Sequence, residues 1–251
     1  YLIRGLYTAA SGMAMETLRT DVTANNLANA NTAGYKRDRA VAASFSEMLI
    51  RRINDHVYNE KPLPSTKPAI GRLGTGVQVQ EVFVDYAPGL LRETGNPLDL
   101  AIEGDGFCQL LQIDANGNRN TFFTRNGSFA LNNNGELVDS AGNLVLGANG
   151  APLVINRNAA EVVVNTDGTI IADGVEQGRV MVIRLADPSV LEKVEGSLFR
   201  LPAGTAGNAV PFAGTIRQGM LENANLNPVT EMVQMITQMR AYEANQKMIK
   251  A

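Results

Sequence analysis

Cysteine, histidine and tryptophan are nearly missing from this chain of 251 residues, which has one cysteine, one histidine and no tryptophan. A single cysteine excludes an intramolecular disulfide and a thiolate metal cage. Cys108 lies in the segment GFCQLLQI, where we expect a buried strand thiol. His56 has no serine or cysteine elbow near it, which favours a solvated histidine over a catalytic triad whose other members would come from distant segments.

Long apolar runs and concentrated positive charge are also missing. No run approaches the roughly 18 residues that a membrane-spanning helix needs. The 22 lysines and arginines are outnumbered by 25 acidic residues, so a basic face for nucleic acid is not expected. The N-terminal YLIRGLYTAASGM lacks the basic region and long apolar core of a secretory signal peptide. The sequence therefore predicts a soluble chain that either stays in the cytoplasm or leaves it by another route.

Both ends of the chain carry apolar residues at helical spacing. They are Leu2, Ile3, Leu6, Ala10 and Met13 at one end, and Val229, Met232, Ile236, Met239, Tyr242 and Ile249 at the other. Spacings of three and four predict amphipathic helices, and Asn227-Pro228 supplies an N-cap followed by proline at the first helical position. Isolated helices of ~25 to 30 residues are marginal in water, so we expect the two to pair. The methionines of the second helix fit either a core or a surface that contacts several neighbours.

The first helix is expected to end within ANNLANANTAGYKR, residues 24–37. Asparagine amides compete for backbone hydrogen bonds, and Gly34 can take the left-handed conformation that closes a helix. One glycine would be enough to end a helix. The additional amides of Asn25, Asn26 and Asn29 therefore either bond to something beyond this helix or only cap it.

Between the ends the apolar period changes to two. GTGVQVQEVFVDY slips by one residue at Glu81, as at a β-bulge, and PLDLAIEGDGF predicts a strand with one buried face. Residues 59–76, rich in proline and glycine, indicate an extended connector. Turns are predicted at Asn126-Gly127, Asn134-Gly135, Ala141-Gly142, Asp167-Gly168 and Asp173-Gly174. We expect an α+β fold: long N- and C-terminal helices paired as a coiled-coil-like unit, with a central, mostly antiparallel β domain.

Three acidic residues, Asp99, Glu103 and Asp105, could act as paired catalytic carboxylates. They fall on the polar face of a predicted strand and its turn, where a tight turn explains the neighbouring glycines. The segment EGDG also lacks the spacing of an EF-hand or a P-loop. We therefore expect no catalytic residues, no cofactor and no metal site.

Four stretches together resemble the flagellar basal-body rod and hook family. They are LIRGLYTAASGM at 2–13, ANNLANANTAGYKR at 24–37, the pair GDGFCQL and FTRNGSFALNNNGELV in the middle, and MRAYEANQK at 239–247. The most specific is Asn-Asn-Leu-Ala-Asn followed by Thr-Ala-Gly-Tyr, which is similar to the family's N-terminal signature. The resemblance spans nearly the whole chain and is weakest around 43–72 and 148–200. Length and the segment Arg240-Ala241-Tyr242-Glu243 look most similar to the distal rod members.

The resemblance implies a structural subunit that polymerises into a hollow helical drive shaft, which transmits torque from motor to hook. Residues 1–33 with 225–251 would form the inner tube, 34–75 with 205–224 the connector, and 76–204 the outer β domain. Polymer contacts are expected at Leu6, Met13, Asn25, Asn26, Asn29, Gly34, Tyr35, Met232, Ile236, Met239 and Tyr242.

The implied partners are further copies of the chain, other rod and hook subunits, the flagellar type III export apparatus and the rings around the rod. Nucleic acid and membrane insertion are not expected. The implied location is the basal body, beyond the inner membrane. Export through that apparatus would account for the missing signal peptide.

Two alternatives remain at this point. One is a proximal rod or hook-type subunit of the same family, and the other is a β module that binds or hydrolyses cell-wall glycan. Three departures from the family pattern stand out: Cys108 where an aromatic is common, Tyr1 in place of an initiator methionine, and an end at Ala251 short of the usual tail. We expect them to mark a trimmed or engineered form.

Overall fold

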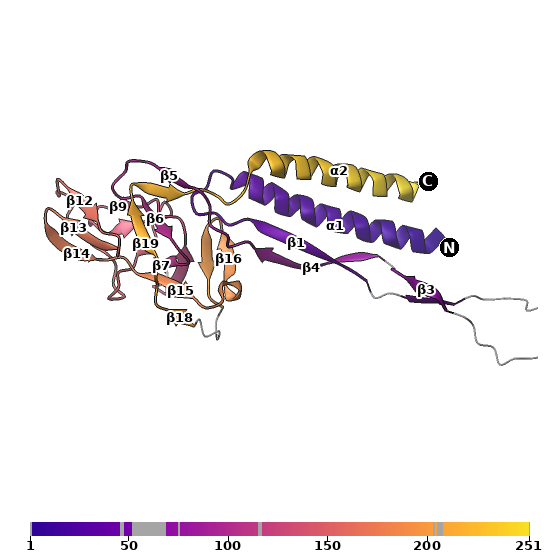
Figure 1. Cartoon of the computed structure of the whole chain (residues 1–251), viewed down its shortest axis with the longest axis horizontal. Coiled ribbons are helices and arrows are strands. Elements are labelled where there is room, and N and C mark those ends of the chain that lie inside the picture. The colour runs from indigo at the N-terminus through magenta and orange to yellow at the C-terminus, as the bar shows by residue number, and fades with distance from the viewer. Residues whose placement is uncertain are drawn as a thin grey trace, which may run out of the picture. The chain divides into compact units, whose positions relative to one another are not determined.

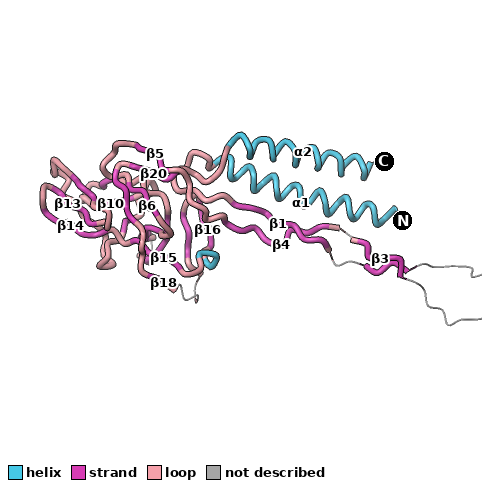
Figure 2. Tube along the Cα trace, viewed as in Figure 1, coloured by secondary structure: helices cyan, strands magenta, loops and turns pink. Residues whose placement is uncertain are grey.

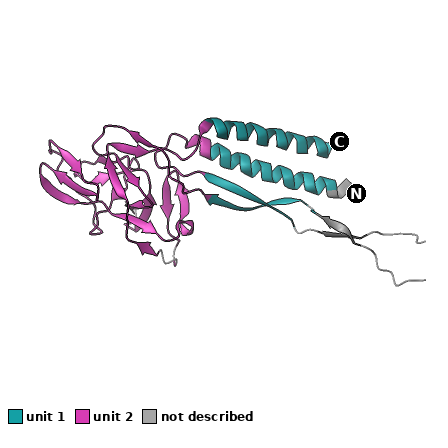
Figure 3. Ribbon diagram, in the orientation of Figure 1, with its two compact units in different colours: residues 1–25, 38–83, 229–251 teal, residues 26–37, 84–228 magenta. Residues whose placement is uncertain are grey.

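The structure is a computed structural model that describes residues 2–45, 48–51, 69–74, 76–114, 117–202, 204 and 208–250. The chain divides into two compact units (Figure 3). Unit 1 comprises residues 1–25, 38–83 and 229–251, and unit 2 comprises 26–37 and 84–228. His56 and most of the expected connector at 59–76 lie outside the described residues.

Unit 1 contains most of two long helices, α1 (Leu2–Ala28) and α2 (Pro228–Lys250). They run antiparallel beside each other, with both chain ends at the same end of the pair (Figure 1). A Cβ on Gly12 would lie 2.9 Å from the amide nitrogen of Asn245, so the helices come close at this glycine. The asparagine-rich end of the first helix and the start of the second at Pro228 are both confirmed. Among the described residues no helix is long and apolar enough to cross a membrane.

The strands of unit 1 form two pairs. One two-stranded sheet joins β1 (Asp38–Ser44) and β4 (Val77–Val84), and the other joins β2 (Met48–Arg51) and β3 (Ala69–Leu73). The pair of β2 and β3 is antiparallel. The amide of Val77 donates to the hydroxyl oxygen of Ser11 at 3.3 Å, which connects β4 to α1.

Unit 2 is built from short strands (Figure 2), and its paired strands run antiparallel. Its nine-stranded sheet follows the order β16-β17-β8-β7-β11-β10-β9, with β15 pairing both β7 and β18. These strands are β7 (Phe107–Ile113), β8 (Arg119–Thr124), β9 (Ala130–Leu131), β10 (Leu137–Val138), β11 (Leu144–Val145), β15 (Val182–Leu185), β16 (Glu192–Glu195), β17 (Leu198–Arg200) and β18 (Ala209–Val210). A short 3₁₀ helix, η1 (Pro188–Val190), follows β15.

Three smaller sheets complete unit 2. They are β12 (Val162–Val164) with β13 (Thr169–Ala172) and β14 (Val175–Arg179), then β6 (Leu100–Glu103) with β19 (Thr215–Gln218), and β5 (Leu91–Glu93) with β20 (Met220–Glu222). The order of one helix, a mostly antiparallel β domain and a second helix is therefore confirmed.

Most of the predicted turns close hairpins. The glycines at 135, 142, 168 and 174 take positive φ values of 81°, 85°, 90° and 82°, which side chains disfavour. In the turn before Asn143, the carboxylate of Asp139 accepts the Asn143 amide at 2.8 Å and fixes the loop. Gly127 works differently: a Cβ there would overlap the carbonyl of Leu100, so this glycine permits two backbones to approach closely.

The core of unit 2 consists of two apolar clusters, one around Leu110 and Val145 and the other around Phe107 and Phe199. Cys108 lies in the first cluster and is 2% exposed, which confirms the buried strand thiol. Burial raises the pKa of this thiol to about 12.

The expectation of one buried face on the strand at 98–103 is wrong, because both faces of β6 are covered. Leu100 and Ile102 join the first cluster, while Ala101 on the opposite face is fully buried. Asp99 is also buried, and its carboxylate accepts hydrogen bonds from the Thr94 hydroxyl at 2.7 Å and the Asn96 amide at 3.0 Å. The sequence pattern predicted that this face of the strand would be exposed to solvent. It is instead occupied by a small side chain, Ala101, and by a carboxylate whose hydrogen bonds are made within the protein.

Candidate assembly surfaces and the anchor at the end of α1

Both helices of unit 1 leave large apolar side chains uncovered. On α1, Leu6 is 48% and Tyr7 67% exposed, and six apolar residues of α2 are 49–69% exposed: Val229, Met232, Val233, Ile236, Met239 and Met248. Among the unit 1 residues whose burial the structure describes (5–25, 38–45, 74, 76–83 and 229–250), two apolar side chains are buried, Ala9 and Met15. A run of exposed apolar side chains along a helix is a candidate interface with other molecules.

The expected contact residues fall into two groups in the structure. Leu6, Asn25, Met232, Ile236 and Met239 are exposed on the helices, with Met13, Asn29 and Tyr242 partly buried. Asn26, Gly34 and Tyr35 are buried and belong to unit 2. Only the first group offers uncovered side chains to a neighbour.

Asn26 and Tyr35 form a buried pair at the end of α1. The Tyr35 hydroxyl donates to the side-chain oxygen of Asn26 at 3.1 Å, and Tyr35 is 0% exposed. The Lys193 ammonium lies 3.7 Å from the centre of the Tyr35 ring and donates to the carbonyl of Lys36 at 2.7 Å. One amide of the asparagine cluster is thus used inside the chain, to hold the segment that follows the helix.

Gly34 has the left-handed conformation predicted from its position, with φ = 66°. Its amide donates to the carbonyl of Glu222 at 2.7 Å. A Cβ on Gly34 would overlap the backbone of Arg125 and Asn126. Glycine is therefore required here both by its φ angle and by the neighbouring chain.

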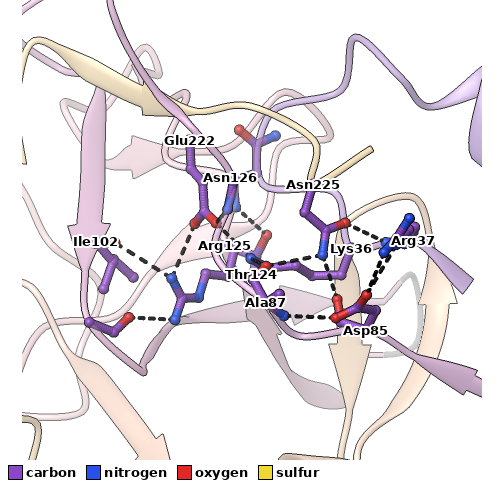
Figure 4. A network of polar contacts seen from close by, with 12 residues as sticks. Lys36, Arg37, Asp85, Ala87, Ile102, Thr124, Arg125, Asn126, Glu222 and Asn225 are labelled. Carbon is purple, nitrogen blue, oxygen red and sulfur yellow. Dashed lines mark hydrogen bonds and ion pairs between the residues drawn. The ribbon is translucent and has the colours of Figure 1, made fainter. Parts of the chain in front are cut away.

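Glu222, at the end of β20, lies at the centre of a buried ionic cluster (Figure 4). One carboxylate oxygen accepts the Lys36 ammonium at 2.6 Å and the Gly89 amide at 2.7 Å, and the other accepts the Arg125 guanidinium at 3.1 Å. Glu222 is 2% exposed and Lys36 1%. This carboxylate therefore has all its contacts inside the protein.

The cluster contains two cations and one carboxylate. Arg125 also donates hydrogen bonds to the carbonyls of Ile102 and Gly104. Lys36 also donates to the carbonyl of Ala87 at 2.8 Å. Burial lowers the pKa of Lys36 and outweighs the opposing effect of Glu222, which favours the charged ammonium. The excess of positive charge makes Glu222 the group on which the cluster depends.

A second layer of bonds surrounds this cluster. The Arg37 guanidinium pairs with the Asp85 carboxylate at 3.0 Å. Asn225 accepts the Arg37 amide at 2.8 Å and donates to the carbonyls of Asp85 and Ala87 at 2.7 and 3.0 Å (Figure 4). The side chain of Asn225 therefore joins the segments at 37 and 85–87 to the one that leads into α2.

Sequence reasoning missed Lys36, Arg125, Glu222 and Asn225. The partners are far apart in the chain, 186 residues in the case of Lys36 and Glu222, so no local spacing could reveal the pairing. The available signal was a charged residue directly after an apolar strand, as in Arg125 after FFT and Glu222 after Met220-Leu221. A strand that ends at the surface has the same sequence pattern, so the pattern alone could not identify a buried ion pair.

Two of the three acidic residues considered for catalysis, Glu103 and Asp99, accept hydrogen bonds from neighbouring side chains. Glu103 accepts hydrogen bonds from Arg217 at 2.8 Å and Thr215 at 3.1 Å. The bond from Arg217 lowers the pKa of Glu103, whereas a general acid needs a raised pKa. Asp99 is held by Thr94 and Asn96. Within the described part of the chain, no three histidine, cysteine or acidic side chains gather in a way that could hold a metal ion.

Helices with uncovered apolar side chains, joined by the chain to a β unit that has its own apolar core, are features of a structural assembly subunit. Three family models match the chain. "Flagella basal body rod protein" covers residues 6–36, "Flagellar hook protein FlgE/F/G D1 domain" covers 101–172, and "Flagellar basal body rod FlgEFG protein C-terminal" covers 217–251.

Full-length relatives agree with these matches. The flagellar basal-body rod protein FlgG of Borreliella burgdorferi is 32% identical over 99% of this chain and 94% of its own length, and FlgG of Bacillus subtilis is 31% identical over the same shares. The rod protein FlgF of Caulobacter vibrioides is 33% identical over 97% of this chain and 91% of its own. The chain belongs to the flagellar basal-body rod protein family, and the resemblance seen in the sequence is confirmed.

Proposed function

We propose that this chain is a distal rod subunit of the flagellar basal body, which polymerises with its own copies into a hollow helical shaft that transmits torque to the hook. The observation that carries the proposal is the uncovered apolar surface of α1 and α2, within a family whose relatives are named as rod proteins. A helix surface that buries little in one molecule is stabilised when neighbouring molecules cover it.

The contacts between subunits are proposed at the exposed members of the predicted set. Ile236 and Met239 of α2, with Leu6 of α1, would pack against neighbouring helices in a coiled-coil-like inner layer. Methionine suits this role because its flexible side chain adapts to neighbours that are not identical. Asn25 and Asn29 would bond laterally, whereas Asn26, Gly34 and Tyr35 would support the interface from inside unit 2.

The remaining partners follow from family membership. We propose assembly with other rod and hook subunits, delivery by the flagellar type III export apparatus, and contact with the rings that surround the rod. The three parts expected from the sequence, an inner tube, a connector and an outer β domain, are proposed for the assembled rod. The alternative is a proximal rod or hook-type subunit of the same family, since a rod protein with another name, FlgF of Caulobacter vibrioides, is as similar as the FlgG relatives.

We infer that the chain catalyses no reaction. Glu103 is held ionised by Arg217, so it has no proton to give to a glycosidic oxygen at neutral pH. Turbidity of purified cell wall tests this inference. We expect no clearing on addition of the protein, and clearing that Glu103→Gln abolishes would overturn it.

Electron microscopy and sedimentation of the concentrated full chain test the polymer. The test variant is Met232→Gln/Ile236→Gln/Met239→Gln, which replaces three exposed apolar side chains of α2 by polar ones. We expect filaments from the unmodified chain and none from the variant. Filaments of equal yield from both would show that this face of α2 is not the interface.

A further inference from the structure

The chain passes between unit 1 and unit 2 four times. The passages fall after residues 25, 37, 83 and 228. Each passage has a residue that takes part in hydrogen bonds or ion pairs near it on the unit 2 side: Asn26, which is buried, and Arg37, Asp85 and Asn225, which are partly buried. All these bonds lie within unit 2, so they join the four segments through which the chain leaves that unit.

Glu222 bonds directly to two of these segments. Its carboxylate accepts from Lys36 and Gly89, and its carbonyl accepts from Gly34. Through Arg125 it also reaches the carbonyls at the end of β6 and in the following turn. Glu222 thus links Lys36, Gly89 and Arg125 through its side chain, and Gly34 through its backbone carbonyl, with β20, which leads into α2.

We propose that Glu222 is a positioning residue, which holds these exit segments in the one arrangement that assembly needs and contributes little to the apolar core. Its carboxylate is the only acidic partner that the structure gives to the ammonium of Lys36 and the guanidinium of Arg125 in this cluster. The expected effect of Glu222 on the polymer rests on the proposed assembly function. Its expected effect on the exit segments does not.

The physical basis is the charge of the cluster. A buried ion pair is strongly disrupted when one partner is removed, because the other charge stays buried without compensation. Without Glu222 two cations would face each other inside unit 2. The exit segments would separate to let water reach them, while the clusters around Leu110 and Phe199, built from apolar side chains, would keep their contacts.

The test compares Glu222→Gln with the double variant Glu222→Gln/Lys36→Met. Glutamine keeps the shape of the side chain and removes its charge, and the second change removes one of the two cations. The matched control is Glu103→Gln, which breaks an ion pair of 2.8 Å whose side chains are about half exposed. Hydrogen exchange of the Gly34 and Gly89 amides reports on the exit segments in the monomer, and labelling of the buried Cys108 thiol reports on the core.

For Glu222→Gln we expect exchange at Gly34 and Gly89 to accelerate at least about tenfold, with Cys108 labelling changed less than about threefold. Sedimented polymer should fall at least about fivefold. The double variant should recover most of the lost protection, because it restores the net charge of the cluster. The control should leave all three readings unchanged.

Unchanged exchange in Glu222→Gln would overturn the proposal, and so would Cys108 labelling that rises in step with exchange, because Glu222 would then be part of the core. If Glu222→Gln does not fold, a folded double variant supports the proposal and an unfolded one overturns it. Failure of the unmodified chain to polymerise would count against the proposed function alone, since the exchange measurements are made on the monomer.

Discussion

Unit 2 and unit 1 differ in how they treat apolar side chains. Unit 2 packs them into two clusters and buries Leu110 and Phe199 completely. Of the apolar side chains of unit 1 whose burial the structure describes, Ala9 and Met15 are buried, whereas others such as Ile236 are half exposed. Folding stability comes mainly from buried apolar surface, so unit 2 has the means to be stable in a single molecule. Unit 1 has much less, and we expect its helices to depend on neighbours.

The largest expected effect on stability is that of Gly34→Ala, which disturbs the contacts of Gly34 with Glu222 and with the backbone of Arg125 in unit 2. A left-handed conformation costs a side chain ~1 to 2 kcal/mol, and the overlap with the Arg125 backbone adds ~1 to 3 kcal/mol. We expect the free energy of unfolding of unit 2 to fall by about 3 kcal/mol in total. Denaturant unfolding followed by Cys108 labelling measures the change.

Gly142→Ala is the matched control for this prediction. Gly142 also has a positive φ, 85°, but nothing lies within 4 Å of the Cβ that alanine would add. It should therefore cost only ~1 kcal/mol, the conformational part. Equal losses for the two variants would show that the close approach to Arg125 contributes nothing.

A large effect on assembly, without one on monomer stability, is expected for Ile236→Ala in unit 1. Ile236 is 52% exposed, so truncation should change monomer stability by less than ~0.5 kcal/mol, far from the ~2 to 5 kcal/mol of a core site. Polymer should fall at least about tenfold, because the lost contact recurs in every subunit. Thermal melting and sedimentation are measured together.

Gln234→Ala is the control, since Gln234 is an exposed polar residue of the same helix. It should leave both readings unchanged. A large fall in melting temperature for Ile236→Ala, with normal polymer yield, would place this side chain in the monomer's own core and contradict the comparison of the two units.

A smaller effect is expected for the pH dependence of unit 2, through Lys36. Burial lowers the folded pKa of Lys36 below the 10.5 of the ordinary side chain. Between these two values the unfolded chain binds a proton that the folded chain lacks, so the free energy of unfolding rises with pH. Lys36→Met should remove this rise.

Denaturant unfolding of both proteins from pH 7 to pH 10.5 checks the sign. Both the unmodified chain and Lys36→Met keep Cys108. Because the folded pKa of this thiol is about 12, it makes the free energy of unfolding fall above pH 9 equally in each protein. The difference between the two stability curves therefore isolates Lys36. Parallel curves would show that Lys36 has the same pKa folded and unfolded.

The smallest effect is expected for Glu192→Gln on the surface of unit 2. Glu192 pairs with Arg200 at 3.0 Å, but both side chains are more than half exposed. Exposed pairs contribute ~0 to 1 kcal/mol and are screened by salt. We expect a change below ~0.5 kcal/mol in the free energy of unfolding by denaturant. A loss as large as that of Gly34→Ala would contradict the distinction between surface and buried ion pairs.

Elements set by local chemistry could be predicted from the sequence. The end of α1 after an asparagine cluster, the start of α2 at Pro228 and the left-handed Gly34 all depend on the preferences of neighbouring residues. The hairpin turns at Gly135 and Gly142 belong to the same class. The motifs at 24–37 and 239–247 were specific enough to indicate the family.

Features set by distant contacts could not be predicted. Alternation in the strand at 98–103 suggested one buried face, but Ala101 and Asp99 are covered by segments that no local pattern identifies. The same reason hid the pairing of Lys36 with Glu222. The helical spacing in α1 was correct, yet Ala9 and Met15 are buried where the expected stripe ran through Leu6 and Ala10.

Limited proteolysis of one preparation, as dilute monomer and as sedimented polymer, tests most directly the claim that unit 1 needs neighbours and unit 2 does not. Helices that bury little apolar surface cannot offset a chain entropy of ~1 to 2 kcal/mol per residue. In the monomer we expect cleavage within 1–25 and 229–250, leaving a resistant β fragment that starts between residues 35 and 75. In the polymer both ends should resist. Ends that resist protease in the dilute monomer, or that are cut equally fast in the polymer, would contradict the account.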